Sequence, residues 1–400
     1  MVSLRYLFLQ HVAQTSPAPL SIEIERAQGI YLYGPDNKEY IDLISGVSVS
    51  NVGHCLPQVV KAVQEQAAKY MHLMVYGEIL QSPQIQFAQT LCSLLPPSLQ
   101  NIYFVNSGSE ATEGAIKLAK RFTGRHKIVA FKNAYHGSTQ GALSVLGNEN
   151  MKNAFRPLIP GVVFIDFNDT EQLNQIDEDT ACVIVEPIQG EAGIILPSDG
   201  YLEKLRQQCS QNGALLVFDE VQTGFGRTGT LFAFQKFNLV PDIITIAKGM
   251  GGGMPLGAFI ASNELMDCLT YNPVLGHITT FGGHPVSCAA ALASLRYLTE
   301  NKIIEEVKAK ELLFKKMLVH PYIIEVRGQG LLLAMELGNS NYLDRFLKLA
   351  LEDGLIFDFF LFCNTAVRIA PTLIISEVEI LMVCNKILLL LDKLKQETGQ

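Results

Sequence analysis

The chain has 400 residues, of which 48% are apolar and 18% are charged. That composition is typical of a globular protein with a large core and excludes a disordered chain. The net charge is −8, and a mildly acidic chain without a basic block is a poor candidate for binding nucleic acid or an anionic membrane. At about 150 residues per domain, the length predicts two or three domains, or one large domain with a smaller companion.

The cysteines and the apolar segments indicate a cytoplasmic protein. The eight cysteines form no CxxC pair, and this spacing favours a reducing compartment over a disulfide framework. The apolar run at the N-terminus is only a few residues long, too short for a secretory signal. The last apolar stretch, Ile380–Leu391, cannot span a bilayer, which needs about 20 apolar residues.

In chain order, short strands are expected first around Gly29–Tyr40, and the middle of the chain then alternates apolar strands with helical patterns. The predicted strands are Val- and Ile-rich runs, as expected for a sheet covered on both faces. They are Ile102–Val105, Lys127–Phe131, Val162–Ile165, Ala181–Glu186, Ala214–Asp219 and Ile243–Ile246. Helices are predicted between them, for example over Glu110–Arg121 and Tyr201–Gln211. The alternation predicts an α/β fold with a mostly parallel sheet.

The region after residue 300 reads differently. A helix, a strand over Glu325–Glu336 and a second helix are followed by strands Leu355–Phe360 and Ala366–Ile369. The last helix is predicted to open with a capping box formed by Ser376 and Glu379. We assign both chain ends to one small α+β domain (residues 1–51 and 296–400), which packs on a large domain (residues 52–295).

A first candidate site is Asn106-Ser-Gly-Ser-Glu, between a predicted strand and a predicted helix. Such a junction exposes unpaired backbone N–H groups at the positive end of the helix dipole, so Gly108 and Ser109 are candidates for holding a phosphate. The alternative is a tight turn in which a serine only caps the helix.

Two charged residues end apolar strands. Asp219 follows Ala-Leu-Leu-Val-Phe, and a carboxylate buried there needs a cationic partner. Lys248 follows another apolar strand and precedes four glycines in five positions, which let the backbone approach a bulky ligand. A desolvated lysine has a lowered pKa and can form a Schiff base. The alternatives are an Asp that caps a helix or pairs with an Arg, and a solvated loop lysine.

Other motifs are weaker. Residues Gly224 to Gly229 match GxGxxG, but they do not open a helix directly after a strand, so they give little support to a nicotinamide site. The histidines show no HxxxH or HExxH spacing, and no metal site is predicted. His54, His136, His277 and His284 each lie beside Gly or Pro, as turn or pocket residues do.

A phosphate site, a buried Asp and a special Lys are together what pyridoxal 5′-phosphate needs: an anion cradle, a partner for the pyridine nitrogen and an amine. With these residues in view, the chain resembles the class III aminotransferases of the fold type I pyridoxal-phosphate superfamily. The resemblance runs over essentially the whole chain. It is carried by Gly29-Ile-Tyr-Leu-Tyr, Gly53-His, Asn106-Ser-Gly-Ser-Glu-Ala, Ala134-Tyr-His-Gly, Val185-Glu-Pro-Ile-Gln-Gly-Glu-Ala-Gly, Phe218-Asp-Glu-Val-Gln-Thr-Gly-Phe-Gly-Arg-Thr-Gly, Thr280-Phe-Gly-Gly and Val367-Arg-Ile-Ala-Pro.

The resemblance implies a role for each matched residue. Lys248 would hold the cofactor covalently and carry a proton, Asp219 would pair with the pyridine nitrogen, and Gln222 would bind the ring hydroxyl. The other implied cofactor contacts are Gly108, Ser109 and Thr280 of the partner subunit at the phosphate, Tyr135 and Val221 on the two faces of the ring, and His136. The resemblance therefore also implies a homodimer.

Glu191 and Arg368 match the family's substrate switch, in which Arg368 binds a substrate carboxylate and Glu191 neutralises it for the other substrate. The implied reaction moves an amino group from an ω-amino acid, a β-amino acid or an amine to a 2-oxo acid such as 2-oxoglutarate, by a ping-pong mechanism. Ser138 stands where several branches carry a carboxylate-binding Arg, so recognition of a second carboxylate is open. A mutase or a decarboxylase of the same family, and a non-catalytic relative, are the alternatives.

Overall fold

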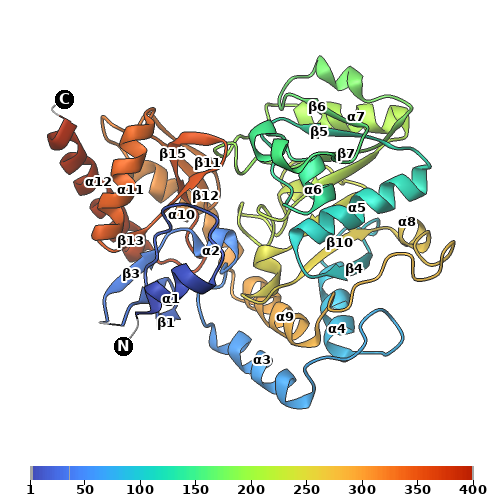
Figure 1. The fold of residues 1–400 in the computed structure, drawn as a ribbon, viewed down its shortest axis with the longest axis horizontal. Helices are drawn as coiled ribbons and strands as arrows, with labels where there is room; N and C mark the ends of the chain where they lie inside the picture. Colours follow the sequence, from blue (N-terminus) through green and yellow to red (C-terminus); the bar gives the residue numbers. More distant parts are fainter. Residues whose placement is uncertain (1–2, 36, 399–400) are drawn as a thin grey trace.

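A seven-stranded sheet forms the centre of the computed structural model, which describes residues 3–35 and 37–398. Its strand order is β4-β10-β9-β8-β7-β5-β6 (Figure 1). The strands are β4 (Asn101–Val105), β5 (Lys127–Phe131), β6 (Val162–Ile165), β7 (Thr180–Val185), β8 (Leu215–Asp219), β9 (Ile243–Ile246) and β10 (Gly257–Ala261). Among the described strands of this sheet, β10 alone runs opposite to the other six, so the predicted α/β fold with a mostly parallel sheet is confirmed.

The six strands predicted for the middle of the chain all occur, each within one residue of its predicted ends. The seventh strand, β10, was not predicted. It has the sequence Gly-Ala-Phe-Ile-Ala, in which only Phe259 and Ile260 favour a strand, and it follows closely on the glycine-rich loop. The burial of all five residues between β4 and β9 outweighs this weak local preference.

Alternate residues of the sheet face two different layers of helices. In β5, Ile128 and Ala130 belong to a cluster with the apolar face of α5 (Gly108–Thr123) and with α8 (Asn263–Asp267). Val129 and Phe131 belong to the opposite cluster, which includes residues of α7 (Tyr201–Asn212) and α9 (Pro285–Glu300). The helices α3 (Pro57–Lys69) and α4 (Ser82–Cys92) pack on α9. Coverage of both faces explains the near-continuous apolar strands.

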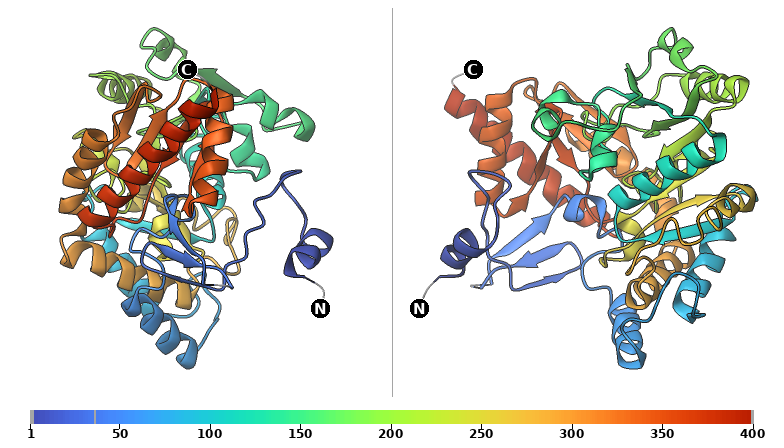
Figure 2. Two further views of the ribbon diagram at one scale, coloured as in Figure 1. Left: turned by 90° about the vertical axis from the view of Figure 1, so that its left-hand side faces the viewer. Right: turned by 45° about the vertical axis from the view of Figure 1, so that its right-hand side comes forward.

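The two ends of the chain meet in a four-stranded sheet, β1 (Arg26–Gln28), β2 (Tyr31–Tyr33), β3 (Glu39–Asp42) and β13 (Leu355–Ile356), in which β13 pairs with β3 in parallel (Figure 2). A second four-stranded sheet has the order β11-β12-β15-β14, with β11 (Glu325–Gln329), β12 (Leu332–Glu336), β14 (Asp358–Phe360) and β15 (Cys363–Ile369). The domain boundaries at residues 51/52 and 295/296 remain a proposal.

Two predicted strands divide in the structure. The strand predicted over Glu325–Glu336 is the hairpin β11–β12, which turns at Gly330 with φ +62°. The strand predicted over Leu355–Phe360 is split between β13 and β14, which belong to different sheets. Each predicted strand contains an interruption, Gly-Gln-Gly in the first and Asp358 in the second, and the backbone changes direction near it.

Of the remaining elements in the described part of the chain, five α-helices lie in the terminal regions, and α6 and the 3-10 turns lie in the middle of the chain. They are α1 (Leu4–His11), α2 (Ser45–Ser48), α6 (Gln140–Ser144), α10 (Ile303–Met317), α11 (Ser340–Glu352), α12 (Glu377–Thr398) and the 3-10 turns η1 (Glu149–Met151), η2 (Asn153–Phe155), η3 (Gln172–Gln175), η4 (Ala233–Gln235) and η5 (Lys248–Gly251). The predicted capping box of α12 is confirmed: the Glu379 N–H donates to Ser376 Oγ at 3.2 Å, and the Ser376 N–H donates to Glu379 Oε2 at 2.7 Å. None of the helices described for residues 3–35 and 37–398 is long and apolar enough to cross a membrane.

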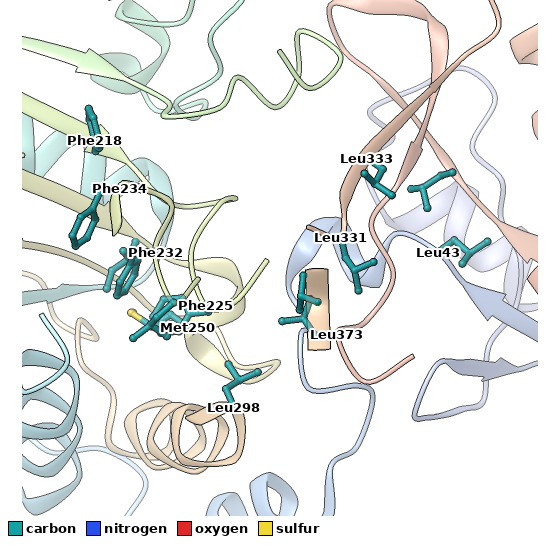
Figure 3. Close-up of a cluster of buried hydrophobic side chains, with 14 of the residues drawn as sticks. Leu43, Phe218, Phe225, Phe232, Phe234, Met250, Leu298, Leu331, Leu333 and Leu373 are labelled. Atoms are coloured by element: carbon teal, nitrogen blue, oxygen red, sulfur yellow. The ribbon is translucent and has the colours of Figure 1, made fainter. Parts of the chain in front are cut away.

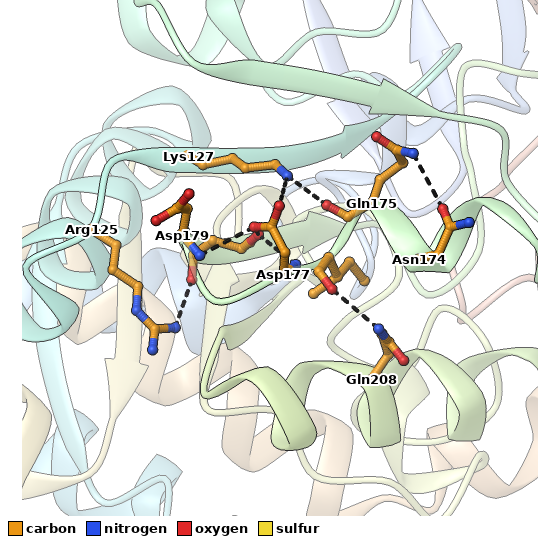
Figure 4. A network of polar contacts seen from close by, with 9 residues as sticks. Arg125, Lys127, Asn174, Gln175, Asp177, Asp179 and Gln208 are labelled. Carbon is orange, nitrogen blue, oxygen red and sulfur yellow. Dashed lines mark hydrogen bonds and ion pairs between the residues drawn. The ribbon is translucent and has the colours of Figure 1, made fainter.

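One buried apolar cluster extends from the central sheet into the terminal sheets. Phe218, Phe232 and Phe234 lie on the side of the central sheet, and Leu43 and Leu333 lie among the terminal strands (Figure 3). The amino edge of the central sheet is held instead by polar contacts: Lys127 Nζ donates to Asp177 Oδ2 at 2.6 Å and to the Gln175 carbonyl at 2.7 Å (Figure 4).

Candidate active site

A pocket of about 450 Å³ lies at the carboxyl edge of the central sheet. Five parallel strands, β4, β5, β7, β8 and β9, each contribute residues that follow their last residue closely in sequence. Ligands bind at this edge in open α/β sheets, where loops leave the strands. The pocket is lined by Val49, Asn106, Ser107, Gly108, Ser109, Tyr135, His136, Gly137, Glu186, Glu191, Asp219, Val221, Gln222, Ala247, Lys248, Gly253, Met254, Pro255 and Leu256.

One end of the pocket is the N-terminus of α5. Ser107 caps this 16-residue helix by accepting a hydrogen bond from the Glu110 N–H at 3.2 Å, so the capping interpretation is correct for Ser107. Gly108 and Ser109 line the pocket in the first turn, where backbone N–H groups point outward. Gly137 closes over Ser109, since a Cβ at Gly137 would lie 2.2 Å from Ser109 Oγ. Capping by Ser107 therefore leaves Gly108 and Ser109 as candidates for holding a phosphate.

Asp219 is buried at the end of β8, and its side chain pairs with His136. His136 Nδ1 lies 2.7 Å from Asp219 Oδ2, and Asp219 Oδ1 accepts the Val221 N–H at 3.0 Å. Burial lowers the pKa of His136, but the hydrogen bond and the charge of Asp219 outweigh it, and the pKa of His136 is raised. The partner that the sequence required for this carboxylate is therefore a histidine and not an arginine.

Lys248 begins η5 and is separated from the end of β9 by one residue, with a positive φ of +46°. Burial lowers its pKa, the charge of Glu191 raises it and that of Arg368 lowers it further, with a net lowering. Among the residues that the structure describes, Lys248 makes no hydrogen bond or ion pair through Nζ. A buried amine with a lowered pKa and no partner, facing a pocket, is suited to nucleophilic chemistry.

Glu191 and Arg368 form a buried ion pair, although 177 residues separate them. Arg368 Nη2 donates to Glu191 Oε2 at 2.6 Å, and the side chains of both residues are almost wholly buried. The Leu361 N–H also donates to Glu191 Oε2 at 3.1 Å. Arg368 Nε and Nη1 are buried and make no hydrogen bond to another described residue.

Three of the residues predicted for the site do not line this pocket. Arg368 contacts the pocket residue Glu191 through its ion pair. Ser138 lies exposed at the margin of the pocket, where its N–H donates to Ser109 Oγ at 3.2 Å. The side chain of Ser138 also lies 3.1 Å from the Tyr135 hydroxyl. Thr280 is exposed in the loop after α8 and is not among the residues around the pocket of its own chain.

Glu186 is a pocket residue to which sequence reasoning gave no role. Burial raises its pKa to about 7, and its carboxylate accepts the N–H groups of Gly190 at 3.1 Å and Tyr135 at 3.2 Å. It thus joins the loop that carries Glu191 to the loop that carries Tyr135. Its place at the end of a buried strand, like that of Asp219, was the signal that could have found it.

The GxGxxG run has a structural role. It opens no α-helix, and its Arg227 is fully buried. Arg227 Nη1 donates to the Leu331 carbonyl at 3.0 Å and Nη2 donates to Ser45 Oγ at 3.1 Å. The residue therefore ties the loop after β8 to the terminal sheets. The structure places no group of three or more His, Cys, Asp or Glu residues suitable for a metal ion within residues 3–35 and 37–398.

The pocket residues fit pyridoxal phosphate. The N-terminus of α5 can take the phosphate, Asp219 can face a protonated ring nitrogen, and Lys248 can supply the amine. Gln222 Nε2 is buried and makes no hydrogen bond to a described residue, so a donor stands ready for a ring oxygen. A Cβ at Gly108 would lie 3.1 Å from Val221 Cγ1, so the Val221 side chain would have to shift by a few tenths of an ångström to admit it.

Residues 12–391 match the family Aminotransferase class-III. An acetylornithine aminotransferase from Methanosarcina acetivorans is 41% identical over 367 residues, which cover 89% of this chain and 88% of that protein. A structure of the ornithine aminotransferase from Toxoplasma gondii, with partial occupancy of PLP at the active site, has a TM-score of 0.92 at 28% identity, covering 98% of this chain and 94% of the other.

A structure of the omega transaminase from Pseudomonas jessenii in complex with PMP has a TM-score of 0.92 at 26% identity, covering 100% of this chain and 99% of the other. The fold and the pocket define a fold type I, pyridoxal-phosphate-dependent transferase. Within that class, the chain belongs to the class III aminotransferases.

Proposed function

We propose that this aminotransferase moves an amino group from an ω-amino acid, a β-amino acid or an amine to a 2-oxo acid, with 2-oxoglutarate as the acceptor. The observation that carries the proposal is the meeting of the α5 N-terminus, the Asp219–His136 pair and Lys248 in one pocket. When bound there, pyridoxal phosphate supplies an aldehyde for the amino group and a ring that takes up electrons. The residues of the chain bind and orient the cofactor and the substrates and move the proton.

Lys248 is proposed as the residue that holds the cofactor and then moves a proton. Burial lowers the pKa of Lys248, which favours the neutral amine that a proton acceptor must be. Asp219 keeps the ring nitrogen protonated, and His136 supports Asp219 from the other side through the 2.7 Å bond. Ser109 and Gly108 hold the phosphate, Gln222 donates to the ring oxygen, and Tyr135 and Val221 enclose the ring.

Glu191 and Arg368 are proposed as the device that admits two kinds of substrate. A substrate carboxylate would bind the guanidinium of Arg368 in two-point geometry after displacing Glu191. A donor without that carboxylate would leave the 2.6 Å ion pair in place. Because both substrates use one pocket in turn, the kinetics are expected to be ping-pong.

The presence of Ser138 supports the proposal that the amino donors lack a second carboxylate. Its hydroxyl is exposed at the pocket margin, and it offers no positive charge there. Relatives of this chain include an acetylornithine aminotransferase and an omega transaminase, so their donors belong in any screen. The eight cysteines are all free thiols, which supports the cytoplasm as the proposed compartment.

A homodimer is proposed because the pocket lacks Thr280 from its own chain. Thr280 lies in an exposed loop that also carries exposed apolar residues, of which Val274 is 71% exposed. A second segment, which contains Val75, Tyr76 and Leu80, lies close to this loop: Val75 and Tyr76 line a cavity of about 800 Å³ together with residues of the loop. Leu80 in this segment is 88% exposed. A second copy covering these residues would bring Thr280 of the partner subunit to the phosphate.

The test is a half-reaction screen. Purified protein saturated with pyridoxal phosphate is mixed with one amino compound at a time, without acceptor, and the visible absorption of the cofactor is followed. The panel contains glutamate, ornithine, acetylornithine, lysine, 4-aminobutyrate, β-alanine and simple amines. Bleaching by amines or ω-amino acids that 2-oxoglutarate reverses supports the proposal. Release of CO2 from the donor, or rearrangement of the donor without an acceptor, would refute it in favour of a decarboxylase or a mutase.

A further inference from the structure

Arg368 lies opposite a second carboxylate, in addition to Glu191. Strands β14 and β15 are antiparallel neighbours, and their register pairs Asp358 directly with Arg368. Side chains of directly opposed residues project from the same face of a sheet, with Cβ atoms about 4.5–5.5 Å apart. The carboxylate of Asp358 is therefore next to the arginine that the proposed function assigns to substrate carboxylates.

The guanidinium of Arg368 rests on the same strand as Asp358. Its Cζ lies 4.7 Å from the centroid of the Phe360 ring, and its Nη2 donates to the Phe359 carbonyl at 3.2 Å. Asp358 is half-buried, and its Oδ1 accepts the Phe359 N–H at 2.9 Å, which holds the side chain near the strand. Burial raises the pKa of Asp358, Arg368 lowers it and Glu191 raises it, so the three charges act on one another.

The ion pair of Arg368 is made with Glu191, and Asp358 forms none with it in this arrangement. Arg368 Nε and Nη1 are nevertheless buried without a partner among the described residues. One cation thus faces two carboxylates before any substrate arrives. When a substrate carboxylate displaces Glu191, Asp358 stays behind and still opposes the incoming negative charge.

We propose that Asp358 is a specificity-determining residue that weakens the hold of Arg368 on substrate carboxylates and so favours donors that bring none to this end of the pocket. This inference rests on the proposed function and narrows it toward amine donors. An amine that leaves the Glu191–Arg368 pair intact meets no added repulsion. A unit charge roughly 6 Å away changes the affinity of a carboxylate about three- to tenfold when the effective dielectric constant lies between about 80 and about 40.

The test compares the parent protein with Asp358→Asn and Asp358→Glu, all saturated with pyridoxal phosphate. Asparagine keeps an acceptor for the Phe359 N–H and removes only the charge, whereas glutamate keeps the charge. The first measurement is calorimetric binding of glutarate, a dicarboxylate that cannot react. The second is the half-reaction rate with glutamate against that with a simple primary amine.

We expect Asp358→Asn to bind glutarate about three- to tenfold more tightly than the parent protein does. Its half-reaction rate with glutamate should rise by a similar factor, and its half-reaction rate with the amine should stay within about twofold of the parent rate. Asp358→Glu should resemble the parent in both measurements. Equal changes for glutarate and amine, unchanged glutarate affinity, or no glutarate binding in any of the three proteins overturns the inference. Tighter glutarate binding by Asp358→Asn without transfer of amino groups in the parent would instead refute the proposed function alone.

Discussion

Replacing Asp219 by Asn separates the contribution of this residue to stability from its contribution to catalysis. Asparagine Oδ1 can still accept the Val221 N–H, which lies 3.0 Å from the Asp219 oxygen. The charged contact to His136 at 2.7 Å becomes a neutral one. A hydrogen bond to a charged group contributes about 1.5–3 kcal/mol and a neutral one about half as much, so we expect the free energy of unfolding to fall by roughly 1–2 kcal/mol.

That loss leaves the protein folded, because folded domains are stable by about 5–15 kcal/mol. The rate should fall much further. Without the carboxylate, nothing in the pocket keeps a ring nitrogen protonated, and removing one preorganised electrostatic group typically lowers kcat by about 10²–10³-fold. We therefore expect the half-reaction rate with the best donor to drop at least about a hundredfold, measured by stopped-flow absorption at saturating cofactor.

Asp242→Asn is the matched control. Asp242 also accepts two hydrogen bonds, from Arg206 Nη1 and the Leu216 N–H at 2.7 Å each, but it precedes β9 at the opposite edge of the sheet. A similar loss of stability is expected, measured by urea denaturation, with a half-reaction rate within about twofold of the parent. The reasoning is refuted if Asp219→Asn keeps more than about a tenth of the parent rate, or if both variants lose activity alike.

Three further predictions concern Ser138 at the margin of the pocket, the titration of Glu186, and Gly137 beside the N-terminus of α5. Ser138→Arg places a cation at the exposed margin of the pocket and should raise kcat/KM for donors with a second carboxylate about tenfold; an unchanged donor profile would show that this position does not face the substrate. Burial raises the pKa of Glu186 to about 7, above its ordinary value near 4.5, so its contribution to stability is fully present below pH 4.5 and is lost as the pH rises through 7. Glu186→Gln should therefore show a smaller fall in the free energy of unfolding between pH 5 and pH 8, by roughly 1–3 kcal/mol, and an identical fall would contradict the assigned pKa. Gly137→Ala drives a Cβ to 2.2 Å from Ser109 Oγ and should weaken pyridoxal-phosphate binding about tenfold or more, whereas Gly200→Ala, also at positive φ but with nothing within 4 Å, should leave the dissociation constant unchanged; equal effects would show that the contact is irrelevant.

Features set by local pattern could be predicted from the sequence, and those set by register or by distant contacts could not. The central strands are continuous apolar runs, so their bounds were found closely. β10 was missed because its strand character comes from burial between two neighbours and not from its own residues. The turn at Gly330 was missed, although the Gly-Gln-Gly run inside the predicted strand is a turn signal.

The residues of the candidate site also fall into these two groups. Asp219 and Lys248 were recognisable because each charge directly follows a buried strand, and such strands share one edge. The Glu191–Arg368 pair was anticipated only through the family resemblance, since 177 residues separate its members. The position of Asp358 beside Arg368 depends on the register of β14 on β15, and no pattern in the sequence specifies that register.

The central claim is that Lys248 holds pyridoxal phosphate in this pocket. The most direct measurement is borohydride reduction of the loaded protein, which fixes the cofactor to its lysine, followed by peptide mass spectrometry. The account predicts one pyridoxyl group per chain, on the peptide that carries Lys248, and none in Lys248→Ala protein that is otherwise folded. A pyridoxyl group on another lysine, or its persistence in the alanine variant, would contradict it.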